Sequence, residues 1–167
     1  MSKRDGPGQG GRRDRPRLEI DIDWVRRRGD TVELGVRLHN RNPERVLHYI
    51  SEVRGIVFDT DRFVVRLTDE GRELIPGAVG RLPAIGRIDP GASAVLALRL
   101  PSSIVRMRTP TVPTAEVELE EHQLRPDADI EVVIGWSDTP YYPDPRGRRE
   151  AAGLTRDWEQ DQARARR

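Results

Sequence analysis

The clearest pattern in the chain is an alternation of apolar and polar residues that begins at Leu18. Four apolar side chains alternate with three acidic ones, namely Leu18, Ile20, Ile22 and Trp24 against Glu19, Asp21 and Asp23. A period of two places every second side chain on the same face, so this segment predicts a strand with one buried and one wet face. The alternation resumes with a second apolar set, Val32, Leu34, Val36 and Leu38. A turn over residues 26–30 joins the two segments and predicts an antiparallel hairpin.

Shorter runs of the same kind follow along the rest of the chain. We expect further strands within residues 46–50, 53–58, 63–67, 94–100, 117–119 and 130–136. Trp136 lies on the apolar side of the last run and is expected in the core. Two proline-bounded segments, 76–90 and 101–113, predict loops, because proline and glycine interrupt regular pairing.

Seven or eight short strands without a long helix predict an all-β fold. We expect an immunoglobulin-like or fibronectin-III-like antiparallel β-sandwich over residues 18–143. A closed small barrel is the alternative, because alternation looks the same in both and strand pairing alone distinguishes them. Residues 1–17 predict a disordered basic arm, since their one apolar side chain is Met1. Residues 144–167 predict an extended or weakly helical tail that a partner would order.

Composition narrows the classes of function. The chain has no cysteine, which excludes disulfide scaffolds, cysteine-based zinc sites, iron–sulfur clusters and thiol nucleophiles. No window approaches the roughly 20 consecutive apolar residues that a membrane span needs, and the N-terminus lacks the apolar stretch of a signal peptide. We therefore expect a cytoplasmic protein without a membrane partner.

The net charge of +1 hides an uneven distribution. Residues 1–17 carry +4, residues 144–167 carry +2, and the segment between them carries −5. Flexible arginine-rich ends suit polyanions, because guanidinium groups bind phosphate bidentately and release counterions. The candidate polyanion-binding residues are Arg12, Arg13, Arg15, Arg17, Arg146, Arg148 and Arg149. Nucleic-acid binding through these termini is the alternative function.

No pattern of catalytic or metal-ligating residues emerges. The three histidines, His39, His48 and His122, lack ligand spacing, and no serine lies in a Gly-x-Ser-x-Gly turn. The segment 59–61 begins like a calcium loop, but Phe63 occupies the next ligand position. We expect no enzyme, no metal, no cofactor and no small-molecule substrate. A looser calcium site, or a metal- or sugar-handling enzyme, would need side chains from distant strands to converge.

Partner binding has stronger candidates. Aliphatic side chains next to arginine are frequent at contact surfaces, and residues 104–107 combine the two. Exposed aromatic side chains after the last strand, and a tryptophan in a tail too weak to fold alone, suit a groove on a partner. The candidate partner-binding residues are Ile104, Val105, Arg106, Met107, Tyr141, Tyr142, Leu154 and Trp158. The alternative for residues 104, 105 and 107 is that they plug one end of the fold. The leading expectation is a non-enzymatic interaction or assembly subunit that docks a protein or another copy of itself.

Two local segments resemble the late-embryogenesis-abundant type 2 family, also described as the water-stress and hypersensitive-response domain. Residues 36–43, which end Asn-Arg-Asn-Pro, are similar to that family's strand followed by an Asn/Pro turn. Residues 88–91, Ile-Asp-Pro-Gly, lead into an alternating strand in a similar way. The resemblance implies a fibronectin-like sandwich without catalytic residues.

Overall fold

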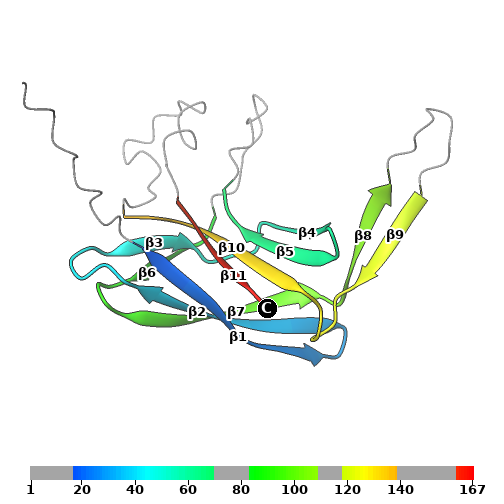
Figure 1. The fold of residues 1–167 in the computed structure, drawn as a ribbon, viewed down its shortest axis with the longest axis horizontal. Coiled ribbons are helices and arrows are strands. Elements are labelled where there is room, and N and C mark those ends of the chain that lie inside the picture. Colours follow the sequence, from blue (N-terminus) through cyan, green and yellow to red (C-terminus); the bar gives the residue numbers. More distant parts are fainter. Residues whose placement is uncertain (1–16, 70–82, 109–117, 139–160) are drawn as a thin grey trace, which may run out of the picture.

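The computed structural model describes residues 17–69, 83–108, 118–138 and 161–167. These residues form strands and no helix, which confirms the all-β prediction (Figure 1). The strands are β1 (Leu18–Arg28), β2 (Thr31–Asn40), β3 (Leu47–Ile50), β4 (Gly55–Asp59), β5 (Arg62–Leu67), β6 (Ile85–Ile88), β7 (Ser93–Pro101), β8 (Ser103–Arg108), β9 (Glu118–Gln123), β10 (Ile130–Ser137) and β11 (Asp161–Arg166). No described helix is long and apolar enough to cross a membrane.

A three-stranded sheet has the order β1-β2-β7 and is antiparallel throughout. The predicted hairpin is confirmed, and Gly29 takes φ 61° in its turn, where glycine is favoured. One detail is wrong: the register shifts between Ile22 and Trp24, so Trp24 is on the opposite face from Ile22. Trp24 lies against Gly35, where an added Cβ would come within 2.3 Å of the indole. The bulge therefore moves Trp24 from the expected core to the outer face.

A six-stranded sheet is built around β10. β5 and β11 flank residues Ile130–Ile134 from opposite edges, and the end of β10 pairs with β3, which pairs with β6. β4 completes the sheet as the hairpin partner of β5. The pairing of β5 with β10 is parallel, so the expectation of a purely antiparallel fold is wrong. A parallel pair needs a long crossover between its strands, and alternation along a strand carries no information about it.

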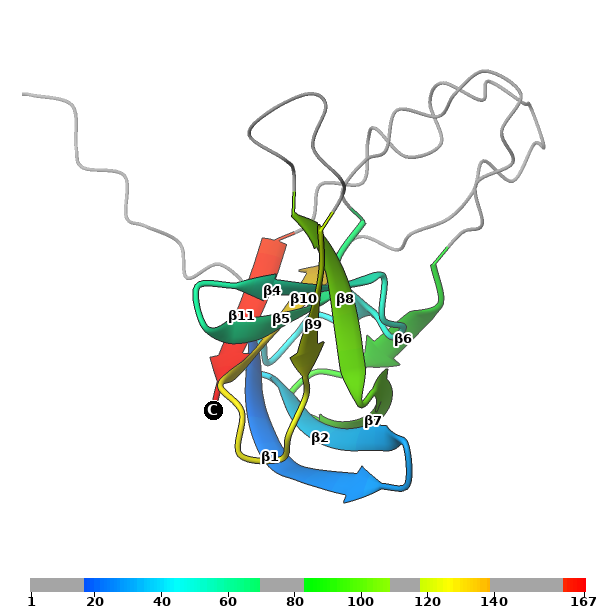
Figure 2. The same cartoon turned by 90° about the vertical axis from the view of Figure 1, so that its right-hand side faces the viewer.

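Both sheets contribute side chains to one hydrophobic core. Figure 2 shows the three-stranded sheet below strands β4 and β5 of the six-stranded sheet. The three-stranded sheet supplies Leu34, Leu38 and Leu100, and the six-stranded sheet supplies Ile134 and Trp136 among others. Trp136 is 5% exposed, as its position on the alternating face predicted. Apolar burial of this kind supplies the main driving force for folding.

Asn40 joins the two sheets at the end of β2. Its side chain is fully buried, and Nδ2 donates to the backbone carbonyls of Arg45, Ile88 and Asp89 at 2.7, 3.2 and 3.1 Å. Its Oδ1 accepts from the backbone N–H of Asn42 at 2.9 Å. A buried amide of this kind is stabilising because its donors and acceptors are all paired.

Three segments predicted as irregular or helix-friendly are strands. β6 lies within the predicted loop 76–90, and β8 lies within the predicted loop 101–113. In both cases the prolines lie outside the paired residues. β11 shows that the helical reading of the tail is wrong for Asp161–Arg166, where pairing with β10 outweighs intrinsic helix preference. The boundary predicted at residue 143, and the arm at residues 1–16, lie outside the described residues.

Candidate functional site

The strands β8 and β9 form a two-stranded ribbon, and in the described part of the chain they pair only with each other. Figure 1 shows the ribbon projecting from one end of the molecule, beyond the core shared by the two sheets. A backbone hydrogen bond from Ser102 N–H to the Asp30 carbonyl at 3.1 Å ties the base of the ribbon to the β1–β2 turn, and one from Leu124 N–H to the Ser102 carbonyl at 2.8 Å joins the two chain segments at that base. The side chains of the ribbon lie on two faces, which differ in polarity.

One face of the ribbon is apolar and exposed. Register places Met107 opposite Leu119, and Val105 opposite Glu121. The exposed fractions of Val105, Met107 and Leu119 are 61%, 70% and 68%. Ser103 and Gln123 close this face at the base, where Gln123 donates to Glu121 at 2.9 Å. We call these six residues the apolar ribbon face.

The opposite face of the ribbon carries charge and the anchor to the body. Arg106 lies opposite Glu120, and Ile104 lies opposite His122. Ile104 packs against the core, and the ring of His122 stacks on Phe58 of β4 with centroids 3.9 Å apart. Phe58 in turn contacts Phe63 edge-on at 5.0 Å. The ribbon is therefore fixed at its base, while Met107 and Leu119 lie beyond this contact.

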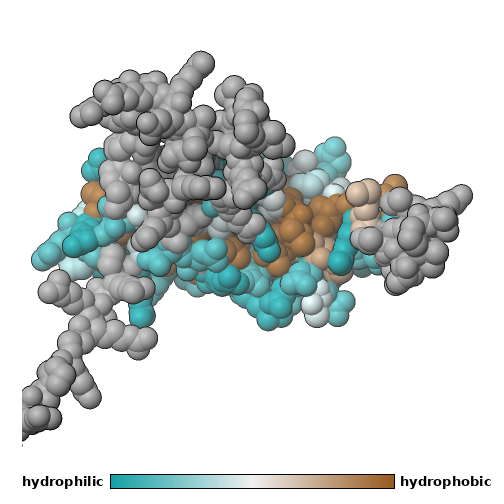
Figure 3. Space-filling model, turned by 90° about the horizontal axis from the view of Figure 1, so that it is seen from above, coloured by the Kyte–Doolittle hydropathy of each residue, from teal (hydrophilic) through white to brown (hydrophobic). Residues whose placement is uncertain are grey.

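Exposed hydrophobic side chains are concentrated on this ribbon. Among the described residues the large exposed ones are Val57, Val95, Val105, Met107 and Leu119. Three of these five belong to the apolar ribbon face, and Figure 3 shows hydrophobic surface gathered toward the end of the molecule where the ribbon lies. Contiguous exposed apolar surface is uncommon on a monomer and marks contact sites.

The structure describes four of the eight predicted partner-binding residues. Residues 104–107 lie on a strand and not in a loop, so Val105 and Met107 face outward while Ile104 and Arg106 take the other side. Ile104 thus has the core contact that the alternative reading expected. Tyr141, Tyr142, Leu154 and Trp158 lie outside the described residues.

Sequence reasoning missed Leu119 as a contact residue. Its alternation with Glu118 and Glu120 was visible, but pairing with Met107 depends on the strand register. Val95 was missed because it lies between the core-facing residues of β7, on the opposite face of the strand. In each case the signal in the sequence is an apolar residue at a strand position whose side chain points away from the core.

Each of the three histidines has its own surroundings. His39 lies 2.7 Å from the Ser93 hydroxyl, His122 stacks on Phe58, and His48 faces Arg87 across β3 and β6. Burial, together with the charge of Arg87, lowers the pKa of His48, so this imidazole is neutral near pH 7. Among the described residues no three His, Asp or Glu side chains lie close enough to hold a metal ion. Residues 59–61 form the β4–β5 turn, where Thr60 and Asp61 have positive φ.

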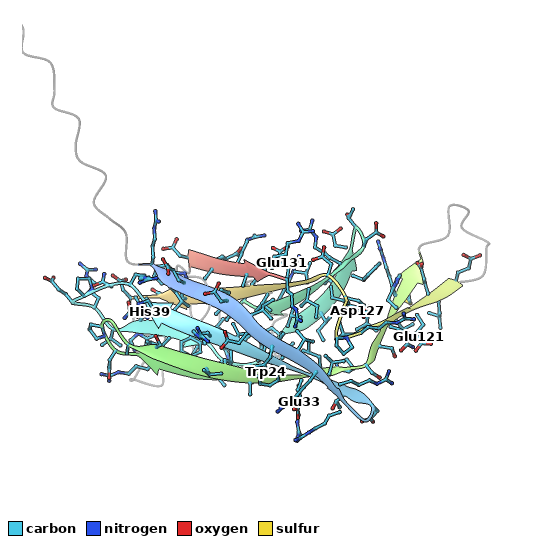
Figure 4. The ribbon with its side chains drawn as sticks, turned by 60° about the horizontal axis from the view of Figure 1, so that its bottom comes forward. Trp24, Glu33, His39, Glu121, Asp127 and Glu131 are labelled. Carbon is cyan, nitrogen blue, oxygen red and sulfur yellow. The ribbon has the colours of Figure 1, made fainter. Side chains whose placement is uncertain are left out.

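The outer face of the three-stranded sheet carries a second notable cluster. Figure 4 shows Trp24 and Glu33 on this outward side. Glu33 binds three guanidiniums, those of Arg26 at 3.0 Å, Arg28 at 3.5 Å and Arg99 at 3.6 Å. The hydrogen bond from Arg26, reinforced by the charges of Arg28 and Arg99, lowers the pKa of Glu33 although burial opposes it. The cluster carries two more positive charges than negative ones.

Eight other arginines of the described residues form ion pairs with a carboxylate. Apart from the three on Glu33, the ion pairs are Arg37–Asp23, Arg41–Glu19, Arg45–Asp138, Arg54–Glu52, Arg62–Glu131, Arg164–Glu131, Arg87–Asp89 and Arg166–Asp129. Of the predicted polyanion-binding residues, Arg17 is exposed. The others, Arg12, Arg13, Arg15, Arg146, Arg148 and Arg149, lie outside the described residues.

No protein-family model, curated protein or solved structure matches the chain. The similarity to the late-embryogenesis-abundant type 2 family therefore rests on the two segments quoted above. The structure brings these two segments together, since the Asn40 amide donates to the carbonyls of Ile88 and Asp89. The resemblance stays a prediction.

Proposed function

We propose that this chain is a non-enzymatic interaction subunit that docks a protein through the apolar ribbon face. The observation that supports this is the exposure of Val105, Met107 and Leu119 on one side of a projecting hairpin. Each Å² of apolar surface that a partner removes from water contributes about 25 cal/mol. Three large side chains on one face of a strand pair can therefore anchor a contact.

The limited stability of a two-stranded ribbon also supports docking to a partner. An isolated two-stranded hairpin is marginally stable in water. This ribbon is held by its hydrogen bonds at the base and by the stacking of His122 on Phe58. The outward side chains Val105 and Met107 take no part in that anchor. A protein that covers them would stabilise the ribbon as well as gain the contact.

A protein partner fits the described surface better than a polyanion. Eleven arginines of the described residues have a carboxylate within 4.0 Å. Eight carboxylates partly neutralise these eleven guanidiniums, which reduces the counterion release on which polyanion binding depends. The terminal arginines are then the better candidates for binding nucleic acid.

We also propose that the two sheets form an immunoglobulin-like β-sandwich. Two features support it: no strand of the three-stranded sheet pairs with a strand of the six-stranded sheet among the described residues, and the two sheets share one core. A closed barrel would instead join the edge strands into one continuous sheet. The parallel pairing of β5 with β10 makes the second sheet mixed.

The function is tested by capture from extracts of the organism that encodes the chain. Tagged full-length protein is compared with the double variant Val105→Asp/Met107→Asp. We expect a defined protein to co-purify with the unaltered chain at moderate salt and to be lost with the variant, because a charge at the contact must be desolvated.

The matched control is Val57→Asp, which places the same charge at a 42%-exposed valine on β4. This control should capture the partner normally, and circular dichroism should show all three proteins folded. Capture of the same protein by the ribbon variant would contradict the proposal. So would recovery of nucleic acid alone, released by salt.

A further inference from the structure

We infer that the apolar ribbon face docks onto the outer face of the three-stranded sheet of a second copy of this chain. The inference rests on the proposed function and names its partner. The receiving surface is the outward row of β7 together with its neighbour on β1, namely Val95, Ala97, Arg99 and Trp24. We call it the β7 face.

The first argument is the distribution of exposed apolar groups. Outside the ribbon, the described exposed large hydrophobics are Val57 and Val95. Val95 is 63% exposed on an edge strand, with exposed Ala97 two residues further on the same side. Trp24 extends this area across the sheet, because it lies over Gly35 and pairs with that residue while Gly35 pairs with Ala97; the Arg26 guanidinium lies over its ring, 4.5 Å from the centroid. The β7 face is thus a second apolar surface of similar character.

The second argument is charge complementarity. Glu121 is the ionisable side chain of the apolar ribbon face. The β7 face borders the cluster in which Arg26, Arg28 and Arg99 surround Glu33, and it therefore has an excess of positive charge. Arg99 is the most exposed of these three guanidiniums, at 75% of its side chain. An acidic apolar surface and a basic apolar surface of one chain suit each other.

The third argument is spacing. Same-face residues of a strand recur about every 6.6 Å, from a rise of about 3.3 Å per residue. On the ribbon, the Val105–Glu121 pair is one such step from the Met107–Leu119 pair. On β7, Arg99 is one step from Ala97 and two from Val95. With β9 laid along β7 and Leu119 over Ala97, Glu121 therefore comes over Arg99, while Met107 lies beside Leu119 across the ribbon.

The contact joins two molecules because a single chain cannot make it. In Figures 1 and 4 the ribbon rises on the side of the six-stranded sheet, whereas Trp24 and Glu33 lie on the outward side of the three-stranded sheet. The two surfaces are different, so the interface is heterologous. Such an interface gives a closed ring or an extending chain of subunits.

The experiment is sedimentation velocity of the full-length chain over a range of concentrations, with charge reversals on either side. We expect mass to rise with concentration for the unaltered chain. Glu121→Arg alone, or Arg99→Glu alone, should weaken association about tenfold through like-charge contact. The double variant Glu121→Arg/Arg99→Glu should restore most of it.

Controls separate a folding defect from a lost contact. Glu33 keeps Arg26 and Arg28 when Arg99 is reversed, so Arg99→Glu should fold, and restoration in the double variant excludes misfolding as the cause. Val57→Asp should associate like the unaltered chain. Association that ignores both reversals would overturn the inference. A monomer at every concentration whose ribbon still captures another protein would overturn it too, while the proposed function would stand.

Discussion

The hairpin β1–β2 and the ribbon β8–β9 are both antiparallel strand pairs, yet they use their apolar side chains in opposite ways. In β2 the residues Val32, Leu34, Val36 and Leu38 are fully buried against the second sheet. In the ribbon, Val105, Met107 and Leu119 are 61–70% exposed. The outer face of the first hairpin is instead covered by ion pairs and by Trp24.

The difference shows how one kind of local structure can have two roles. The β1–β2 hairpin gains its stability from a face that the core covers. The ribbon has its anchor at the base, through Ile104 and the stacking of His122 on Phe58, and leaves its other face free. Alternation along a strand states which side chains share a face, but the neighbouring elements decide whether that face is covered.

The largest expected effect is the difference in stability lost when a side chain is truncated in the β1–β2 hairpin and when one is truncated in the ribbon. Leu34→Ala removes a fully buried side chain and should lower the free energy of unfolding by about 2–5 kcal/mol. Met107→Ala removes a side chain that is 70% exposed and should change it by no more than about 0.5 kcal/mol in the monomer. Urea denaturation of both variants measures the difference. Equal losses would contradict the assignment of the ribbon face as uncovered.

The next prediction concerns the hydrogen bonds that the Asn40 side chain makes between the two sheets at the end of β2. Asn40→Ala removes three donated hydrogen bonds and one accepted bond at a buried position. We expect a loss of about 1–3 kcal/mol, because backbone groups lose their partners. Urea denaturation reports it, with Asn42→Ala, which disturbs an exposed turn, as the milder comparison.

A smaller and more local effect is expected at the ribbon base. His122→Ala removes the stacking on Phe58, which is worth about 0.5–1.5 kcal/mol for aromatic pairs. Amide hydrogen exchange should become faster in β8 and β9 while β2 stays protected. Conservative His122→Phe should retain slow exchange. Uniform acceleration over both hairpins would show that the ribbon is not a separate unit.

The smallest effect is the pH dependence of the outer ion cluster. The pKa of Glu33 is lowered below its usual value of 4.5, chiefly by the hydrogen bond from Arg26. A carboxylate with a lowered pKa stabilises the fold above its unfolded pKa, and the contribution is lost as pH falls through the folded pKa. Glu33→Gln should therefore be less stable than the unaltered chain at pH 7, and the gap should narrow below about pH 4.5. Thermal unfolding across pH measures it; a gap that widens in acid would contradict the sign.

Local alternation predicted the strands whose inner faces meet the core, because each of them has one buried and one wet side. It placed Leu34 and Trp136 correctly. It failed at Trp24, because a one-residue bulge reverses the faces without changing the composition. It also missed β6 and β8, where nearby prolines suggested loops.

The candidate site was predictable in part. Val105 and Met107 were recognised as apolar residues beside arginine, and both are exposed. Their pairing with Glu121 and Leu119 joins segments separated along the chain, which sequence pattern does not specify. The β7 face depends on packing of the same kind: Val95 becomes a surface residue because no described strand covers the outside of β7.

The most direct test of the docking surface is photo-cross-linking at single positions of the full-length chain. A photoreactive phenylalanine analogue replaces Met107 in one protein and Val57 in another, since both are exposed apolar positions on strands. After irradiation in cell extract, the account predicts a protein adduct from position 107 and little from position 57. No adduct at position 107, or equal adducts at both, would contradict the assignment of the ribbon as the docking surface.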